Sequence, residues 1–180
     1  MVIAVLAEGC AEYIRSNYLE FFLRCICEGI SYPSPVVRNA ALYALGQYSE
    51  HLQPEISQYS SELLPVLFEY LGQICSYIKQ EKKEPHAVGR MFYALEMFCE
   101  NLNERILPYL PKLMERLFDI LNADTSPHVK ELTLSAVGAA ACASEEHMLP
   151  YFETIINILN NYLTTEPSEE NMCLQVQAVG

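Results

Sequence analysis

The sequence predicts an all-α protein in which antiparallel helix pairs stack side by side as a right-handed α-solenoid. Three observations support this fold class. Apolar residues recur at three- and four-residue spacing along the chain, sustained two-residue alternation and hairpin turns are nearly absent, and a helix-pair pattern recurs about every 42 residues. The chain has 180 residues, 51% of them hydrophobic, which is enough for a real core and argues against disorder.

The first helix of each pair is predicted from a bulky apolar stripe. The prolines fall mostly between these stripes or in their first turns, where a missing N–H is tolerated. Pro65 is the exception, because it falls inside the run 56–72, where it either kinks the helix or marks its true start. The stripes are Leu63, Leu64, Leu67, Phe68 and Leu71; Leu110, Leu113, Leu117 and Leu121; and Phe152, Ile155, Ile156, Leu159 and Leu163.

The repeat emerges when the chain is aligned with itself. Pro35 aligns with Pro85 and Pro127 at separations of 50 and 42 residues, and the same offsets relate Ile56, Ile106 and Met148. The unit is a bulky first helix, a short turn and a second helix rich in small residues. This period and this helix pair are typical of HEAT and armadillo solenoids.

The alignment divides the chain into five units. The 50-residue spacing indicates an insertion near residues 73–84, which is either a charged loop between helices or a helix extension. Both ends of the chain fall within helices without a polar capping repeat, so we expect a fragment of a longer array. The units are 1–13, the second helix of a partial repeat; 14–55; 56–105, with the insertion; 106–147; and 148–180, a partial repeat.

Composition and motifs exclude several classes of function. The net charge of −12 disfavours direct nucleic-acid binding, and no apolar run is long enough to span a membrane. The seven cysteines are interpreted as reduced, mostly buried thiols of a cytosolic or nuclear protein. No catalytic or phosphate-binding motif occurs, and the histidines do not cluster with cysteines as metal ligands. We therefore expect a monomer that is not an enzyme and that needs no cofactor or metal.

The candidate binding residues lie on the second helices, which line the concave face of such a solenoid. Val37, Ala44 and Tyr48 are assigned to the core stripe, and a neighbouring stripe that includes Gly46 is expected to face inward to solvent. Repeat-aligned glutamates form a carboxylate row beside two tyrosines, which suits Lys- or Arg-rich segments. The alternative is that these glutamates are ordinary solvated helix ends. The candidates are Glu8, Asn39, Tyr43, Glu50, Tyr93, Glu96, Glu100 and Glu131.

A second set of residues has a structural role in the alignment. Arg38 and Lys130 occupy matching positions, and Asp124 precedes Lys130 by six residues. We predict that they form a ladder of hydrogen bonds between repeats. The ladder is discontinuous, because Val88 stands at the basic position of the third repeat.

Several segments carry a family resemblance that covers essentially the whole chain. Five stretches occur in the following order: "SPVVRNAALYALGQYSEHLQP", "FYALEMFCENL", "LPYLPKLMERLFDIL", "KELTLSAVGA" and "MLPYF". Together they resemble the middle part of the chain in receptors of the importin-β (karyopherin-β) family. The resemblance implies a HEAT array that binds basic cargo proteins, such as histones and ribosomal proteins. It also implies Ran·GTP control, contacts with FG-nucleoporins through the full-length receptor, and shuttling between cytoplasm and nucleus.

A different class of function remains open. The same repeats build scaffold subunits that hold a protein complex together without any role in transport. The two hypotheses differ in Ran dependence, because Ran·GTP releases the cargo of a receptor and leaves the partner of a scaffold bound.

Overall fold

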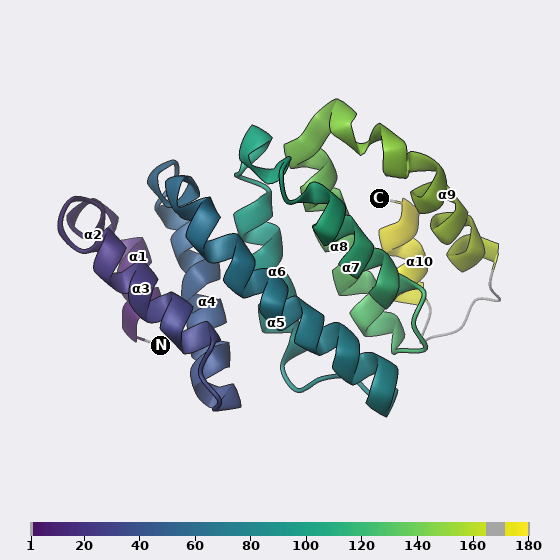
Figure 1. Cartoon of the computed structure of the whole chain (residues 1–180), viewed down its shortest axis with the longest axis horizontal. Coiled ribbons are helices and arrows are strands. Elements are labelled where there is room, and N and C mark those ends of the chain that lie inside the picture. Colours follow the sequence, from purple (N-terminus) through teal and green to yellow (C-terminus); the bar gives the residue numbers. More distant parts are fainter. Residues whose placement is uncertain (1, 165–171, 180) are drawn as a thin grey trace.

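The computed structural model describes residues 2–164 and 172–179, and within these residues it is helical and contains no strand. The predicted all-α class is confirmed, and Figure 1 shows the helices stacked in sequence order. The α-helices are α1 (Val2–Gly9), α2 (Ala11–Asn17), α3 (Leu19–Ile30), α4 (Pro35–His51), α5 (Ser60–Glu81), α6 (Val88–Cys99), α7 (Leu110–Leu121), α8 (Pro127–Ser144), α9 (Leu149–Thr164) and α10 (Met172–Val179).

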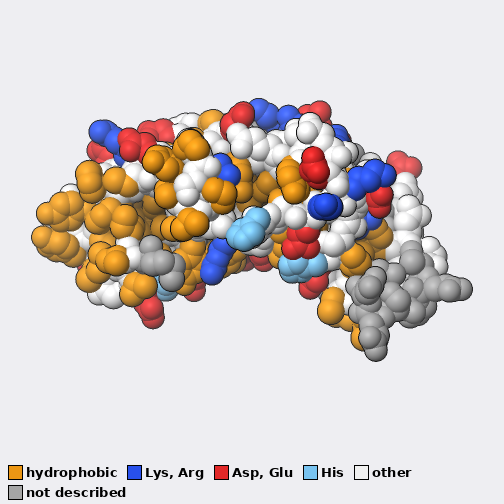
Figure 2. Space-filling view, turned by 90° about the horizontal axis from the view of Figure 1, so that it is seen from below, with side chains coloured by type: hydrophobic (Ala, Val, Ile, Leu, Met, Phe, Trp, Pro, Cys, Tyr) orange, Lys and Arg blue, Asp and Glu red, His pale blue; other side chains and the backbone are white. Residues whose placement is uncertain are grey.

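The helices form two layers. The first helices α3, α5, α7 and α9 make one layer, and the second helices α1, α4, α6, α8 and α10 make the other (Figure 1). Within the second layer α4 packs between α1 and α6, and α8 packs between α6 and α10. Figure 2 shows an arched outline that is hollowed along the edge formed by the second helices. The second helices therefore line the concave side, as expected for a HEAT-type solenoid.

Short 3-10 turns connect α4, α6 and α8 to the first helices that follow them, whereas α2 connects α1 to α3. The 3-10 turns are η1 (Glu55–Tyr59), η2 (Asn103–Ile106) and η3 (Glu145–Met148). The repeat-aligned residues Ile56, Ile106 and Met148 fall in these turns and are buried. The unit boundaries stay a prediction, since the terminal units 1–13 and 148–180 include residues 1, 165–171 and 180, which lie outside the described residues.

The core runs continuously between the two layers. The leucine stripe of α5 is fully buried at Leu63, Leu64 and Leu67, and burying one such side chain contributes about 1.5–3 kcal/mol. Small residues set the closeness of the paired helices. A Cβ placed on Gly29 would lie 2.7 Å from the Cβ of Ala41, so α3 and α4 approach closely because this position carries no side chain.

The insertion near residues 73–84 is largely a helix extension. Helix α5 has 22 residues, whereas the equivalent α7 has 12. It ends at Lys82, which adopts a left-handed conformation. Pro65 lies inside α5, so it does not mark the start of this helix. Among the described residues no helix is long and apolar enough to cross a membrane.

The expectation that most cysteines are buried is wrong. Only Cys75 and Cys99 are buried, while Cys10, Cys142 and Cys173 are exposed and the other two are half-buried. All seven are free thiols. Helical spacing alone does not tell which face of a helix its neighbours cover, so the apolar context of these cysteines was misleading. Burial raises the pKa of Cys99 to about 12 and that of Cys75 to about 11, which keeps both thiols protonated.

Candidate functional site

The candidate residues of the second helices lie at two levels of the concave face. Glu8, Glu50 and Glu100 are exposed at or near the C-terminal ends of α1, α4 and α6. Asn39 and Glu131 lie near the N-terminal ends of α4 and α8. At 1.5 Å per residue, the eleven positions from Asn39 to Glu50 span about 16 Å. The carboxylate row and the Asn39–Glu131 level are therefore separate parts of the surface.

Two of the predicted tyrosines meet across the joint between α4 and α6. The ring centroids of Tyr43 and Tyr93 are 6.2 Å apart, with the planes inclined by 30°. Tyr93 also covers Gly46, since a Cβ added to that glycine would lie 2.1 Å from Cε1 of the ring. The expectation that Gly46 faces solvent is wrong, because a side chain from the following repeat covers it. The absence of a side chain at Gly46 makes room for this ring.

A short polar chain connects the tyrosine pair to the carboxylate row. The Gln47 side-chain amide donates to the Tyr93 hydroxyl at 2.7 Å and lies 3.4 Å from Glu50 Oε2. The Tyr93 hydroxyl donates to the same carboxylate oxygen at 3.3 Å. Burial raises the pKa of Tyr93, so the phenol stays a hydrogen-bond donor at neutral pH. The repeat pattern does not indicate Gln47, because its contact is with a residue 46 positions away.

A cation already lies against one face of this aromatic pair. The guanidinium carbon of Arg90, on α6, is 4.3 Å from the ring centroid of Tyr43, within the range of cation–π attraction. Arg90 itself is exposed. Nothing in the repeat alignment distinguishes this position, so the sequence does not predict the contact. Within the chain, one face of the Tyr43 ring therefore contacts the guanidinium group of Arg90.

Glu96 is less exposed than the repeat-aligned glutamates Glu8, Glu50 and Glu100. It is half-buried on α6, one turn before Glu100. Burial raises its pKa, and the nearby Glu100 carboxylate raises it further. The ionised forms of these two glutamates therefore repel each other in a poorly hydrated setting. A bound cationic group would relieve this repulsion.

At the level of Asn39 and Glu131, the contact found lies within a single helix. Glu131 is half-buried, and its carboxylate lies 4.0 Å from Nδ1 of His128 one turn earlier on α8. Asn39 is half-buried near the start of α4. The structure thus brings Tyr43, Tyr93 and Glu50 into one contact group, places Glu96 and Glu100 together, and leaves Asn39 and Glu131 at the far end.

The proposed ladder residues contact neighbouring repeats in a way that differs from the expected hydrogen bonds. The Arg38 guanidinium lies 4.9 Å from the ring centroid of Tyr70, and Lys130 Nζ lies 5.4 Å from that of Tyr162. Both rings stand 32 residues further along, on the first helix of the next repeat. Asp124 pairs with Lys82 of the preceding repeat at 3.2 Å. Cation–π contacts therefore stand where hydrogen bonds were expected at Arg38 and Lys130, whereas Asp124 accepts a hydrogen bond from Lys82 across the repeat boundary.

In the third repeat, the positions equivalent to the cation and the ring carry apolar side chains. Val88 and Ile120 are separated by the same 32 residues, and each is 1% exposed. An apolar pair therefore stands where the other two repeats place a cation and a ring. At Val88 the ladder is therefore interrupted because apolar side chains occupy the equivalent positions.

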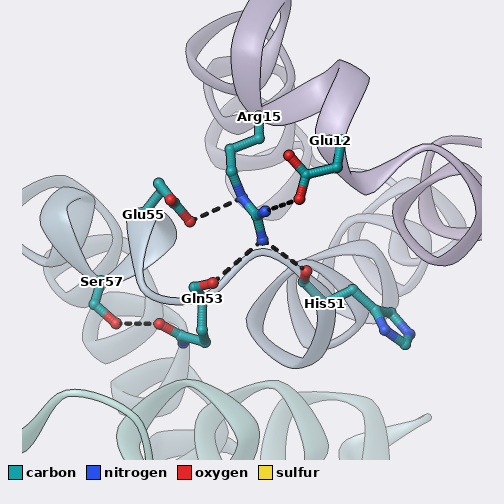
Figure 3. A network of polar contacts seen from close by, with 6 residues as sticks. All are labelled: Glu12, Arg15, His51, Gln53, Glu55 and Ser57. Carbon is teal, nitrogen blue, oxygen red and sulfur yellow. Dashed lines mark hydrogen bonds and ion pairs between the residues drawn. The ribbon is translucent and has the colours of Figure 1, made fainter.

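The first joint is tied at the edge where second helices end. Figure 3 shows Arg15 of α2 pointing into the loop that follows α4. Its Nε lies 2.9 Å from Glu55, and its guanidinium donates to the carbonyl oxygens of His51 and Gln53 at 3.4 and 3.2 Å. Ser57 then donates to the Gln53 side chain at 2.6 Å and to Asn101 O at 3.1 Å. These contacts link the consecutive units 14–55 and 56–105 along this edge.

The fold and the two-layer surface define the class of protein: a HEAT-type α-solenoid whose second helices line a concave face. Residues 31–177 match the family described as importin subunit beta-1-like, TPR repeats. The chain is 43% identical to human importin-4 and 41% identical to mouse importin-4, each over 99% of its length. It is also 31% identical to the probable importin subunit beta-4 of Schizosaccharomyces pombe over 93% of its length.

The chain therefore belongs to the importin-β family. It spans 16% of the length of the human and mouse relatives. Its fold is similar to the crystal structure of Kap121p, with a TM-score of 0.80 and 24% identity, over 98% of this chain and 16% of that one. The family description names TPR repeats, whose usual period is about 34 residues; the period of about 42 residues found here is closer to that of HEAT repeats.

Proposed function

We propose that this segment binds Lys- or Arg-rich cargo on its concave face as part of a nuclear transport receptor. The contact group that connects Tyr43, Tyr93, Gln47 and Glu50 supports this proposal most directly. It places aromatic faces and a carboxylate next to each other across two repeats. Cationic side chains bind such surroundings through charge-assisted hydrogen bonds and cation–π attraction.

The positions of the glutamates also support binding over a purely structural role. Glu50 and Glu100 lie at the C-terminal ends of α4 and α6, where the helix dipole disfavours a negative charge by about 0.3–1 kcal/mol. Glu96 keeps a carboxylate in a half-buried place beside Glu100. Side chains that lower stability where they stand are characteristic of binding surfaces. Solvation alone therefore does not explain the positions of these glutamates, whereas a binding role does.

The spacing of the row fits an extended peptide. Packed helices lie about 8–10 Å apart, and an extended chain advances about 3.3 Å per residue. A basic segment that crosses the second helices would thus meet one carboxylate about every three residues. We propose that such segments belong to basic proteins, with histone and ribosomal-protein tails as the cargo class.

A binding measurement tests the proposal. We expect the triple variant Glu50→Gln, Glu96→Gln and Glu100→Gln to bind a Lys- and Arg-rich peptide more weakly than wild type at low salt. Exposed ion pairs contribute about 0.2–1 kcal/mol each, so three give about a 3- to 150-fold loss of affinity. Wild-type binding should also weaken with added salt.

The matched control keeps the change of net charge and moves it to the other layer. Glu69, Glu115 and Glu153 are exposed on the first helices α5, α7 and α9. Replacing these three by Gln should weaken binding much less. Equal affinities of the two triple variants, measured by isothermal titration calorimetry, would show that the peptide responds only to overall charge.

For the complete receptor, we propose nuclear import under Ran·GTP control, contacts with FG-nucleoporins and shuttling between cytoplasm and nucleus. The importin-4 relatives support this proposal by family membership. A chain of the relatives' full length that contains this sequence should release a bound basic peptide when Ran·GTP is added. Retention of the peptide would instead favour the scaffold function.

A further inference from the structure

The C-terminal extension of α5 makes a series of contacts with the following repeat. Helix α5 is ten residues longer than α7, and Figure 1 shows its last turns running beside the lower ends of α7 and α8. This part of the chain is the insertion that breaks the 42-residue period. It carries Lys79, Lys82 and Glu84, whose side chains all reach across the joint.

Four side-chain contacts cross this joint in register. Cys75 Sγ lies 3.7 Å from Arg116 O, and Lys79 Nζ lies 2.9 Å from Asp119 Oδ2. The contacts continue beyond the helix, where Lys82 pairs with Asp124 at 3.2 Å and Ser126 donates to Glu84 at 2.8 Å. Each contact joins residues 40–42 positions apart. Ser126 also caps α8, since its hydroxyl accepts from the Val129 N–H.

The side-chain contacts at the neighbouring joints between repeats are of a different kind. At the preceding joint, Arg38 of α4 contacts Tyr70 of α5, and at the following joint the Tyr162 hydroxyl of α9 donates to Leu121 O of α7 at 2.8 Å. At those two places the contacts use aromatic side chains. At the α5–α7 joint they use ion pairs between partly exposed side chains, with Lys79 54% and Lys82 68% exposed.

We propose that the extension of α5 and the residues up to Glu84 form a charge-dependent strap that fixes repeat 106–147 onto repeat 56–105. Added salt, or neutralisation of Lys79 and Lys82, loosens this joint selectively, because exposed ion pairs are screened by mobile ions whereas buried apolar and aromatic contacts are not. The strap therefore sets the angle between α6 and α8, and through it the spacing of the concave surface at this joint. The proposal does not depend on which ligand that surface binds.

Amide hydrogen exchange tests the strap. In the whole chain, we expect the variant Lys79→Gln with Lys82→Gln to increase exchange in residues 116–126 by roughly three- to tenfold, with little change in residues 149–158. The variant Lys83→Gln is the matched control, because Lys83 is a neighbouring exposed lysine outside the four contacts. A control that increases exchange as much as the double variant would overturn the proposal.

A charge exchange separates the ion pair from general loss of helix stability. Lys79→Glu alone should increase exchange in the same residues, because it places two carboxylates together. Adding Asp119→Lys restores an opposite pair and should bring exchange back toward the wild-type rate. If the two changes together increase exchange at least as much as either alone, the pair does not hold the joint.

Discussion

Helices α4 and α8 carry a glycine at the same repeat position, but the two glycines have different surroundings. Gly46 is covered by the ring of Tyr93, whereas a Cβ added to Gly138 would meet nothing within 4 Å. The difference comes from the next second helix. The residue equivalent to Tyr93 is Gln177 on α10, and its amide donates to Ser135, the equivalent of Tyr43, at 3.0 Å.

The comparison shows that one repeat position is used for two purposes. At the α4–α6 joint, a missing side chain makes room for a ring that is held by Gln47 and placed beside Glu50. At the α8–α10 joint, a glutamine and a serine form a hydrogen bond and leave the glycine uncovered. The aromatic pair and the carboxylates of the proposed binding surface therefore occur together on α4 and α6.

The largest expected difference between the two regions is in thiol reactivity. Cys99 on α6 is fully buried and its pKa is raised to about 12, whereas Cys142 on α8 is exposed. A thiol reagent at pH 7–8 should therefore modify Cys142 at least about a hundredfold faster, because Cys99 reacts only after local or global opening. Peptide mapping by mass spectrometry measures both rates. Similar rates would mean that α6 is not packed as described.

The glycines themselves provide the next test. Gly46→Ala should destabilise the fold by about 1–3 kcal/mol, because the new methyl group displaces the Tyr93 ring. Gly138→Ala should be neutral or stabilising by up to about 1 kcal/mol, because alanine is the better helix former and space is available. Urea unfolding of the two variants makes the comparison. Equal effects would show that Tyr93 does not hold the position found here.

A smaller change tests the polar chain alone. Tyr93→Phe keeps the ring over Gly46 and removes the hydroxyl that accepts from Gln47 and donates to Glu50. We expect a loss of about 0.5–1.5 kcal/mol, typical of one hydrogen-bonded group. Tyr77→Phe is the control, because Tyr77 is 42% exposed on α5. The measurement is again urea unfolding, and a larger loss for the control would contradict a specific role for the Tyr93 hydroxyl.

The smallest expected effect concerns Glu96. Burial and the Glu100 carboxylate raise its pKa above the ordinary 4.5, so the folded state holds the proton more tightly than the unfolded chain does. Tighter binding of this proton stabilises the fold below pH 4.5, and this stabilisation is lost as the pH rises through the pKa of Glu96 in the folded state. Glu96→Gln should therefore stabilise the fold at pH 7, by less than about 1 kcal/mol after solvent screening. The gain should disappear toward pH 4 when melting is followed by circular dichroism.

Stability and binding should respond to Glu96 in opposite directions. The Gln variant is expected to be more stable at neutral pH and to bind a basic peptide more weakly than wild type. If Glu96→Gln lowers stability at pH 7, the carboxylate has an unrecognised favourable partner. The repulsion between Glu96 and Glu100 would then not support a binding role.

Much of the fold could be predicted from the sequence, because each unit of the solenoid has a similar local pattern of apolar and small residues. The leucine stripe of α5 and the small residues of α4 each indicate which helix face is buried, and the offsets of 42 and 50 residues indicate how the pairs follow one another. The 50-residue offset predicts eight extra residues near 73–84, and α5 is longer than α7 there. Their conformation was left open between a loop and a helix extension, because charged residues are compatible with both.

The candidate site could be read only in part. Tyr43, Tyr93 and Glu50 were identified from aligned positions, whereas Gln47 and Arg90 were missed. Both act on residues of the neighbouring repeat, and their positions show no periodic pattern. The expected exposure of Gly46 is wrong for the same reason, because its burial depends on the side chain that the next second helix presents.

The sequence by itself determined the helices, their pairing and the order of the repeats, because hydrophobic spacing and proline positions act over a few residues. Only the tertiary structure decided how one repeat fits the next: Tyr93 on Gly46, Arg38 on Tyr70, and the strap from Lys79 to Asp119. These contacts join side chains some 30–50 residues apart. Their geometry depends on the angle and spacing of stacked helices, which the packing of all the side chains at a joint sets together.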